Sequence, residues 1–419
     1  MSEMVSEGWK ELQLSEIGNL STSAVNKESR DDEKYVSLLN YMDVYNHDLL
    51  TDSYRFQKVT APDNQIINSS VKQGDVFFTP SSETPDDIGH SVVFLGKAKN
   101  IVHSYHTVRL RLSSNKILND NFKAYAFKSE STYKYFRKIA QGSTRFTLSL
   151  SGFNKLKIFV PPLPEQKKIA SILTSVDEVI ENTQKQIDKL QDLKKGTMNE
   201  LLTKGIGHTE FKDSELGRIP KSWECVKLGH IAKVTDGAHK TPKYIDSGVP
   251  FLRVTDIQST EINITKTKYI SREEHQELCK RCLPEKGDVL LSKNGTIGIT
   301  KIINWDWEFS IFVSLALLKI HNKDNVNVEF LDLYLQSPIV RKQIKDRAKQ
   351  GSVTNLHLEE IRDFDFVIPS TEEQNTIVCI VSSIETNIRT KVHKLHETQS
   401  LKKSLMQDLL TGKVRVSVN

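Results

Sequence analysis

The sequence predicts an α+β protein with two tandem globular α/β domains separated by two long, antiparallel, coiled-coil-like helices. Three observations predict this architecture: a repeat that spans the chain, two helical stretches with apolar residues at spacings of three and four, and globular segments of short strands and turns. The repeat makes the molecule pseudo-two-fold, because each copy is a globular part followed by a helical part.

The repeat is visible from the start of each copy to its end. Gly8–Ile17 aligns with Ser222–Ile231 at an offset of 214, and Pro161–Gly205 aligns without a gap on Pro369–Lys413 at an offset of 208. Matched pairs in the second stretch include Glu165/Glu373, Gln166/Gln374, Ile187/Leu395, Leu193/Leu401 and Lys194/Lys402. An alignment this long and orderly indicates two copies of one module.

The repeat and the composition of each stretch divide the chain into five segments. They are a first globular domain at 1–160, a central helical spacer at 161–205, a linker at 206–222, a second globular domain at 223–367 and a C-terminal helical spacer at 368–413.

The two helical spacers have clear starts and regular apolar seams. The first begins after the proline-rich Val160–Pro164, and the second begins at Ser370–Glu373, which fits a reciprocal capping box. About 40 helical residues at 1.5 Å each predict a rod of roughly 60 Å. Such helices are most often dimerisation devices, but this chain carries both rods itself, which favours antiparallel packing of one on the other. The seam residues are Leu173, Val176, Ile180, Thr183, Ile187 and Leu190 in the first rod, and Val381, Ile384, Ile388, Lys391, Leu395 and Thr398 in the second.

The globular parts combine short strands with a helix before each Gln-Gly-Ser sequence. Turn residues such as Asn294-Gly295 separate the strand candidates. The expected strands are Tyr35–Leu39, Asp75–Thr79, Val92–Leu95, Thr107–Leu112, Phe251–Val254, Asp288–Ser292 and Ser310–Ile320, and the expected helices are Glu130–Ala140 and Glu329–Lys349.

The composition restricts both partner and compartment. Lys and Arg number 58 against 53 Asp and Glu, a formal charge of +5, which permits nucleic-acid binding without arguing for it. The longest apolar run is about half of the ~20 residues that cross a bilayer. The four cysteines do not form a secreted disulfide framework, and the polar first residues do not fit a secretory signal. We therefore expect a cytoplasmic protein with reduced cysteines and no membrane partner.

Each globular part has basic residues beside small polar loops. Lysine, arginine, hydroxyl and loop N–H groups suit phosphate oxygens, and Lys, Asn and Thr on glycine turns can also reach base edges. A solvated surface helix or an ordinary hairpin tip would give the same pattern. The candidates for nucleic-acid contact are Lys138, Ser143 and Arg145 in the first domain, and Lys240, Lys243, Lys293, Asn294, Thr296 and Lys349 in the second.

The sequence predicts neither a catalytic residue nor a metal site. Cys279 and Cys282 with His275 upstream resemble half of a zinc site, but no second ligand pair lies at a usable spacing. No glycine-rich nucleotide-binding fingerprint follows a strand, and the glycines around Gly96-Lys97 do not have P-loop spacing. We therefore expect a protein that binds rather than catalyses.

At this point the residues resemble a known family, the specificity (S) subunits of type I restriction–modification enzymes. The resemblance covers essentially the whole chain and depends on the tandem layout together with short motifs. These are Pro161–Gln166, Lys194–Thr203, Gly217–Trp223, Gly287–Leu291 and Asn294–Gly298. The second helix departs from the pattern, because Ile368–Gln374 replaces the proline-rich entry.

The resemblance implies a non-catalytic DNA-binding subunit of a host-defence complex. Each globular domain would be a target-recognition domain that reads one half of a bipartite, asymmetric site in double-stranded DNA. The helices would set the spacing and dock two methylation (M) subunits. S-adenosylmethionine would belong to the M subunits, and ATP and Mg²⁺ to partner subunits that include restriction (R) subunits, so this chain would bind no cofactor directly. The helix residues assigned to partner docking are Ile169, Val176, Ile180, Ile187, Leu193, Ile377, Ile384, Ile388, Leu395 and Leu401.

Three alternatives predict different behaviour. A stand-alone DNA methyltransferase or nuclease would transfer label or cleave DNA as the purified chain. A protein scaffold that uses the rods would leave no sequence-specific footprint on DNA. An RNA-binding adaptor would need paired stacking aromatics, which the sequence does not show at a recognisable spacing.

Overall fold

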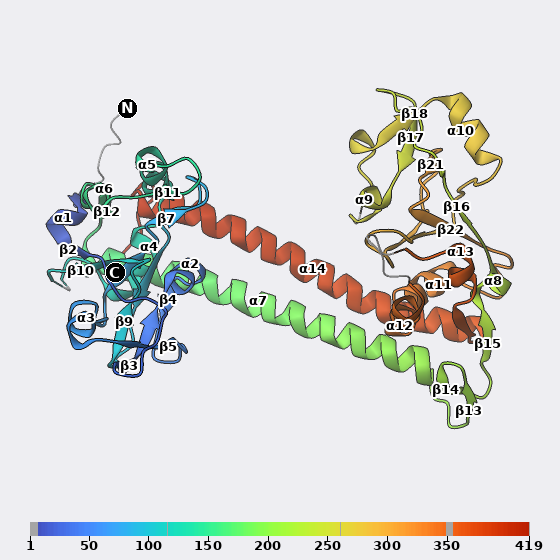
Figure 1. The fold of residues 1–419 in the computed structure, drawn as a ribbon, viewed down its shortest axis with the longest axis horizontal. Helices are drawn as coiled ribbons and strands as arrows, with labels where there is room; N and C mark the ends of the chain where they lie inside the picture. The colour runs from blue at the N-terminus through green and yellow to red at the C-terminus, as the bar shows by residue number, and fades with distance from the viewer. Residues whose placement is uncertain (1–6, 115, 260, 349–354, 419) are drawn as a thin grey trace. The chain divides into compact units, whose positions relative to one another are not determined.

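The computed structural model describes residues 7–114, 116–259, 261–348 and 355–418, which divide into two compact units (Figure 1). Unit one consists of residues up to 184 together with 393 onward, and unit two consists of residues 185–392. Each unit therefore contains one globular part, which we call head one (residues 7–160) and head two (residues 223–367), and a segment of each long helix.

Head one is built on a five-stranded sheet in the order β2-β10-β6-β8-β4 and a three-stranded sheet in the order β5-β3-β9. The strands of these sheets are β2 Gly18–Ser21, β3 Lys34–Leu39, β4 Leu49–Leu50, β5 Gln57–Ala61, β6 Val76–Phe78, β8 Ser91–Phe94, β9 Ile101–His103 and β10 Val108–Leu112. Two strand pairs complete it, β1 Lys10–Gln13 with β12 Lys157–Val160, and β7 Ser81–Ser82 with β11 Phe146–Thr147. Its helices are α1 Leu14–Ile17, α2 Tyr41–Asn46, α3 Asp63–Asn68, α4 Asp120–Ala126, α5 Glu130–Ile139 and α6 Leu150–Asn154.

Unit two repeats this frame with a four-stranded sheet in the order β16-β22-β19-β20 and a three-stranded sheet in the order β18-β17-β21. Its strands are β13 Phe211–Ser214, β14 Gly217–Pro220, β15 Glu224–Lys227, β16 Ala232–Asp236, β17 Val249–Leu252, β18 Lys268–Ile270, β19 Val289–Ser292, β20 Thr300–Ile302, β21 Ser310–Ile311, β22 Leu315–Ile320 and β23 Asp365–Ile368. Its helices are α8 Leu228–Ile231, α9 Val254–Ile257, the 3-10 helix η1 Ile264–Lys266, α10 Arg272–Cys279, α11 Val328–Leu335, α12 Pro338–Arg347 and α13 Leu358–Arg362.

The strand registers show that the two heads share one frame. In head one, Leu110 lies opposite both Leu20 and Val76. In head two, Leu318 lies opposite Val234 and Val289 in the same antiparallel arrangement. The small sheets also agree, since β3 runs parallel to β9 and β17 runs parallel to β21. The predicted repeat is therefore a structural repeat.

The long helices are α7 (Leu163–Lys204) and α14 (Thr371–Leu410). In unit one, Leu173 near the start of α7 joins the same buried core as Leu409 near the end of α14. In unit two, Leu202 near the end of α7 shares a core with Ile377 near the start of α14. In each unit, the start of one long helix therefore shares a core with the end of the other, which confirms the predicted antiparallel pairing.

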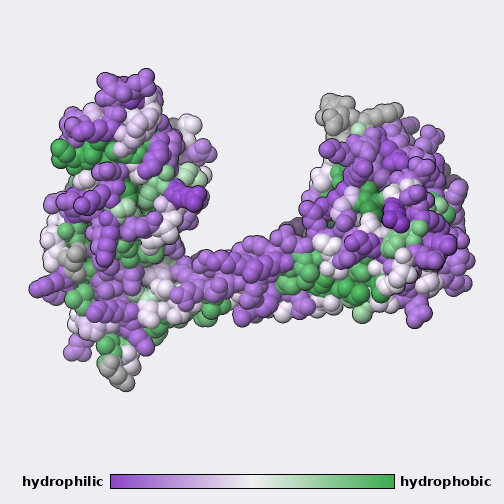
Figure 2. Space-filling model, turned by 90° about the horizontal axis from the view of Figure 1, so that it is seen from below, coloured by the Kyte–Doolittle hydropathy of each residue, from purple (hydrophilic) through white to green (hydrophobic). Residues whose placement is uncertain are grey.

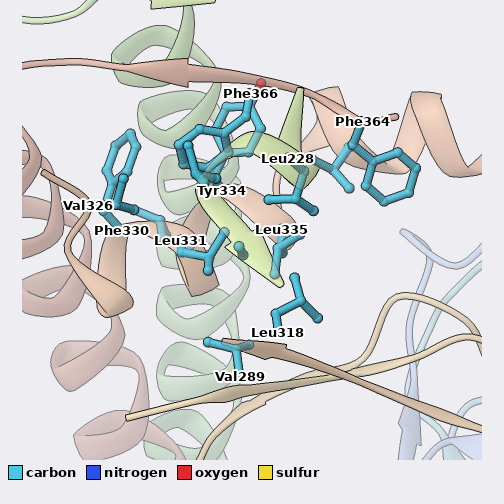
Figure 3. Close-up of a cluster of buried hydrophobic side chains, with 14 of the residues drawn as sticks. Leu228, Val289, Leu318, Val326, Phe330, Leu331, Tyr334, Leu335, Phe364 and Phe366 are labelled. Atoms are coloured by element: carbon cyan, nitrogen blue, oxygen red, sulfur yellow. The ribbon is translucent and has the colours of Figure 1, made fainter. Parts of the chain in front are cut away.

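The core of head two lies between its larger sheet and the helices that follow it. Figure 3 shows Val289 and Leu318 of the sheet facing the α11 residues Leu331 and Leu335, with Phe366 of β23 beside Tyr334. The rings of Tyr334 and Phe366 meet edge to face at 4.6 Å between centroids. Because this apolar surface is removed from water, it stabilises the head and fixes where its loops begin.

Several predicted elements differ from the structure. Ser310–Ile320 was expected as one strand, but β21 and β22 belong to different sheets and a turn joins them. The helix predicted at Glu329–Lys349 is two helices, because Ser337 caps a new start and Pro338 occupies its first turn. The strand predicted at Phe251–Val254 ends at Leu252, and Val254 begins α9. The stretch predicted as a linker contains the β13–β14 hairpin.

The predicted capping box at the start of α14 is only half present. Ser370 Oγ accepts a hydrogen bond from the Glu373 backbone N–H at 3.3 Å, as expected. The Glu373 carboxylate does not bond back to the cap, because it accepts hydrogen bonds from Trp223 Nε1 at 2.9 Å and Ile206 N at 2.8 Å. A tertiary contact therefore takes the place of the local one.

Candidate nucleic-acid interface

In head one, two loops that are far apart in sequence meet at the end of the large sheet. The short strand β7, which follows β6, pairs with β11, which follows the basic end of α5. Leu148 N donates to Pro80 O at 2.8 Å, and Arg145 Nη2 donates to Ser81 Oγ at 3.0 Å. The polar loops of head one therefore form one surface with fixed backbone geometry.

Head two brings the corresponding loops together. Leu356 N donates to Lys293 O at 2.9 Å, and Asn294 forms an isolated antiparallel bridge with Asn355. The loop after β19 therefore lies against the segment that follows α12, as the loop after β6 lies against the segment that follows α5. The two heads use the same position of the frame for loops of different sequence.

The predicted contact residues of head one lie on this surface. Lys138 is exposed in the last turn of α5, and Ser143 and Arg145 are exposed in the loop before β11. The three cover an exposed polar area that begins at the basic end of α5. Their contact with nucleic acid remains a prediction.

The predicted residues of head two fall into three groups. Lys240, Lys243 and Thr296 are exposed on loops, and Lys349 lies outside the described residues. Asn294 is half-buried, and its side-chain oxygen has no hydrogen-bond partner among the residues that the structure describes. Lys293, which was predicted as a nucleic-acid contact, is only 5% exposed, and its ammonium lies 3.4 Å from Asp236.

Asp236 lies at the centre of a cluster of charged and polar side chains that the sequence analysis did not predict. Its buried carboxylate accepts hydrogen bonds from Arg281 Nη2 and from His239 Nε2 at 3.1 Å, in addition to the contact with Lys293. A cavity of about 430 Å³ opens beside it, lined by Gly237 and Lys240 among others. Gly237 is required there, since a Cβ at this position would stand 1.8 Å from the Ile311 carbonyl oxygen.

The half zinc site suggested by Cys279 and Cys282 has another explanation in the structure. His275 is buried and its Nδ1 lies 2.9 Å from Ser310 Oγ, so the ring belongs to a polar contact inside the head. Burial raises the pKa of both thiols, which keeps them protonated. Within the described ranges, no three His, Cys, Asp or Glu side chains are grouped so that they could hold a metal ion.

The same polar anchor joins each head to the start of its long helix. In unit one, Trp9 Nε1 donates to Glu165 at 3.0 Å, and in unit two, Trp223 Nε1 donates to Glu373 at 2.9 Å. The neighbouring glutamine repeats as well. Gln166 accepts from Asn119 N at 2.7 Å and donates to Pro161 O at 2.8 Å, and Gln374 makes the equivalent bonds to Asn327 N at 2.9 Å and Pro369 O at 2.9 Å.

A different third group completes each anchor. In unit one, Arg415, beyond the end of α14, donates to the Glu165 carboxylate at 2.7 and 2.9 Å. In unit two, His208, beyond the end of α7, lies 3.0 Å from Glu373. The segment that follows each long helix thus covers the tryptophan–glutamate pair of the unit in which that helix ends.

The helix residues assigned to partner docking do not share one environment. The exposed ones are Leu193 and Leu401, each 53% exposed and equivalent in the repeat. Each precedes a lysine that makes an ion pair, Lys194 with Glu385 at 2.6 Å and Lys402 with Asp177 at 2.6 Å. In Figure 2 the surface of the helical segments is largely hydrophilic, with some apolar areas. The residues turned inward are Ile169, Ile187, Ile377 and Ile384, which are buried, and Val176, Ile180, Ile388 and Leu395, which are half-buried.

Comparison with known proteins identifies the family of these domains. A family profile described as "Type I restriction modification DNA specificity domain" matches residues 6–192 and again residues 220–402. The two matches cover most of the chain and follow the repeat. Among the residues that the structure describes, no helix combines the length and the apolar character that crossing a bilayer requires.

Individual relatives agree with the profile. The chain is 30% identical over 355 residues to the putative type I restriction enzyme MjaX specificity subunit of Methanocaldococcus jannaschii, covering 82% of this chain and 79% of the relative. It is 29% identical over 333 residues to the MjaVIII specificity subunit of the same organism, covering 77% and 76%. The type I restriction–modification S subunit from M. genitalium has a similar fold, with a TM-score of 0.52 at 15% identity over 98% of this chain and 97% of the other. A chain from the solved structure "Structural basis underlying complex assembly and conformational transition of the type I R-M system" gives a TM-score of 0.63 at 16% identity over 98% and 99%.

Proposed function

This chain belongs to the family of type I restriction–modification specificity subunits, and we propose that each of its heads reads one half of a bipartite, asymmetric site in double-stranded DNA. The single observation that carries this proposal is that the paired loops occupy the same position on both heads but differ in sequence and side chains. A common frame holds the loops in place, while different loop residues select different base pairs.

We propose further that α7 and α14 set the spacing between the half-sites and dock two copies of one methylation subunit. The antiparallel pairing supports this role, because it gives equivalent surfaces on the two modules. Leu193 and Leu401 have the same exposure and the same neighbouring ion-paired lysine. Two identical partners would bind equivalent surfaces of a pseudo-two-fold chain.

In this proposal the chain contributes specificity and its partners contribute the chemistry. Methylation subunits would bring S-adenosylmethionine for adenine methylation, and restriction subunits would use ATP and Mg²⁺ for translocation and cleavage. The polar residues of the paired loops suit DNA contact, since hydroxyls, amides and cations all reach phosphate and base edges. Two recognition surfaces joined by a spacer multiply their selectivity when the spacing matches the DNA helix.

The experiment compares the adenine-methylation map of cells with and without this gene, by single-molecule sequencing. Loss of one split, asymmetric motif is the expected result, and it would give both half-sites and the spacer. An unchanged map from a complex that co-purifies with an active methyltransferase would contradict the proposal. A stand-alone enzyme would instead transfer label from S-adenosylmethionine as the purified chain.

A further inference from the structure

The Asp236 cluster of head two has more positive charge than its buried carboxylate balances. Asp236 is 2% exposed and contacts Arg281, His239 and Lys293. Lys293 is buried with it, so this pair is nearly neutral by itself. The side chains of Arg281 and His239 are each 55% exposed, so their outer edges face the cavity and solvent.

Head one shows that the frame does not need this cluster. At the corresponding junction, between the segment after β2 and the end of α3, Ser23 Oγ donates to Ser69 Oγ at 2.8 Å. In head one the two segments are linked by a neutral hydrogen bond, with Arg109 and Arg111 donating to the backbone carbonyls beside Ser69, whereas in head two an ion cluster forms the link itself. Buried ion pairs are weak contributors to stability, because desolvation offsets much of their attraction. The cluster of head two therefore points to a binding role rather than a structural one.

The geometry orients the Arg281 guanidinium for binding. Among the residues that the structure describes, only Asp236 accepts a hydrogen bond from the guanidinium, through Nη2. His239 Nε2, which donates to the same carboxylate, lies 2.9 Å from Nη2 and is not an acceptor. A guanidinium fixed along one side offers its remaining donors in one plane, which suits two neighbouring acceptors. Guanine presents such a pair, O6 and N7, at its major-groove edge.

The other residues of the cavity favour a base edge over a phosphate. Glu274 and Glu277 line the same hollow as Arg281, and the Glu277 carboxylate is ion-paired with Lys280. The Glu274 carboxylate disfavours a phosphate, whereas a G·C pair offers guanine acceptors to an arginine and a cytosine amino group to a carboxylate. The cavity therefore provides both partners that such a base pair requires.

We propose that Arg281, held by Asp236, reads a guanine in the half-site of head two. Arg281 makes the base contact, and Asp236 is a positioning residue that fixes the guanidinium. This inference rests on the proposed function, since it names the base-reading residue of one head. Head one has no counterpart of the pair at the Ser23–Ser69 junction, so its own half-site provides an internal control.

The test uses the chain assembled with its methylation subunit and compares Arg281→Ala, Arg281→Lys and Asp236→Asn with wild type. Arg272→Ala is the matched control, because Arg272 lies on α10 at a similar exposure but is ion-paired with Glu308. Motifs are mapped by single-molecule sequencing, and binding is measured on duplexes substituted at each position. Arg281→Ala and Arg281→Lys should each lose roughly ten- to a hundredfold discrimination at one G·C pair of that half-site. The half-site of head one should be unchanged.

The outcomes separate the inference from the proposed function. A uniform loss of affinity with an unchanged motif would make Arg281 a phosphate contact and overturn the inference. An unchanged motif and affinity, or a second half-site without a G·C pair, would also overturn it while the split motif of the wild type stands. A wild-type complex that methylates no split motif would overturn both. Loss of the same discrimination in Asp236→Asn, with an unchanged unfolding midpoint, would support the positioning role.

Discussion

The two heads are alike where they join the long helices and differ where their loops meet. The tryptophan–glutamate and glutamine–asparagine bonds occur in both, at nearly the same distances. At the junction between the segment after β2 and the end of α3, head one has a hydrogen bond between Ser23 and Ser69. At the corresponding junction, head two has the Asp236 ion cluster. Repeated contacts thus mark the frame, and differing contacts mark the surface that the frame presents.

This contrast also separates stability from selectivity. Residues of the repeated anchors are buried, as with Gln166 at 1% and Gln374 at 0% exposure. Exposed residues on or beside the loops, such as Lys240 and Lys138, form few contacts that would hold the frame together. Equivalent changes in the two anchors should therefore lower the stability of their units by similar amounts. Changes in the loops of one head should alter the recognition of one half of the DNA site only.

The largest effect should come from removing an anchor tryptophan. Trp223→Ala and Trp9→Ala each remove a buried indole and leave a glutamate without one of its donors, so each should cost about 3–5 kcal/mol of unfolding free energy. Urea unfolding of the purified chain measures this loss. Tyr105→Ala, at a side chain that is 48% exposed, is the control and should change the free energy by less than about 0.5 kcal/mol. A large loss for one tryptophan alone would break the equivalence of the two anchors.

The next effect concerns the repeated glutamines. Gln166→Ala and Gln374→Ala each leave backbone groups at a helix start without partners, so each should cost about 2–3 kcal/mol. The two values should agree, because the bonds are the same in the two units. Gln191→Ala, on an exposed position of α7, provides the matched control in the same urea titration.

A third prediction uses the buried His103 of head one, whose position in head two is occupied by Ile311. Burial, with Arg109 and Arg111 nearby, lowers the pKa of His103 from 6.5 to about 3. Below pH 6.5 the unfolded chain binds a proton that the folded chain does not, so the stability contribution is complete above that pH and is lost as the pH falls. The loss should be about 1.4 kcal/mol per pH unit between about pH 6 and pH 3.5.

The equivalent residue of head two supplies the matched variant. His103 is the last residue of β9, which runs parallel to β3 in head one. Ile311 is the last residue of β21, which runs parallel to β17 in head two. His103→Ile should therefore remove the loss of about 1.4 kcal/mol of unfolding free energy per pH unit that we assign to His103 below about pH 6. Thr107 keeps its own hydrogen bond to Ser104 O at 2.8 Å in this variant. Urea unfolding at pH 7 and pH 5 measures the difference, and an unchanged acid dependence would contradict the assignment to His103.

The smallest effect should come from the exposed cations on the loops and at the end of α5. Lys138→Ala with Arg145→Ala in head one, and Lys240→Ala with Lys243→Ala in head two, should weaken DNA binding by the assembled complex. For each phosphate contact that is lost, the slope of the logarithm of the binding constant against the logarithm of the salt concentration should become less steep by about one. A residue whose removal changes neither the affinity nor the slope makes no phosphate contact.

The sequence was a good guide to the features that the repeat encodes. The alignment matched Glu165 with Glu373 and Gln166 with Gln374, and these are the residues that anchor both heads. Apolar spacing predicted both long helices within a few residues of their ends. The break at Ser337-Pro338 was missed, because one helix was predicted over Glu329–Lys349, although a serine cap before a first-turn proline is the local signal for a new helix.

Other features could not be read from local patterns. The run at Ser310–Ile320 is apolar throughout, and nothing in it specifies that its two halves join different sheets. The roles of Arg281 and Lys293 depend on a carboxylate about 50 residues away in sequence, and no spacing rule connects such residues. Glu373 was expected to cap its own helix, because its spacing from Ser370 fits a capping box. Its actual partners, Trp223 and Ile206, are distant in sequence and could not be predicted from a local pattern.

The central claim is that each head reads one half of a split DNA site independently of the other. The most direct test maps adenine methylation by single-molecule sequencing in cells that carry this chain with the loop Ser81–Thr84 of head one replaced, while head two is unchanged. The account predicts a motif in which one half changes and the other half and the spacer length stay the same. A motif that changes in both halves, or an active complex whose motif is unchanged, would contradict it.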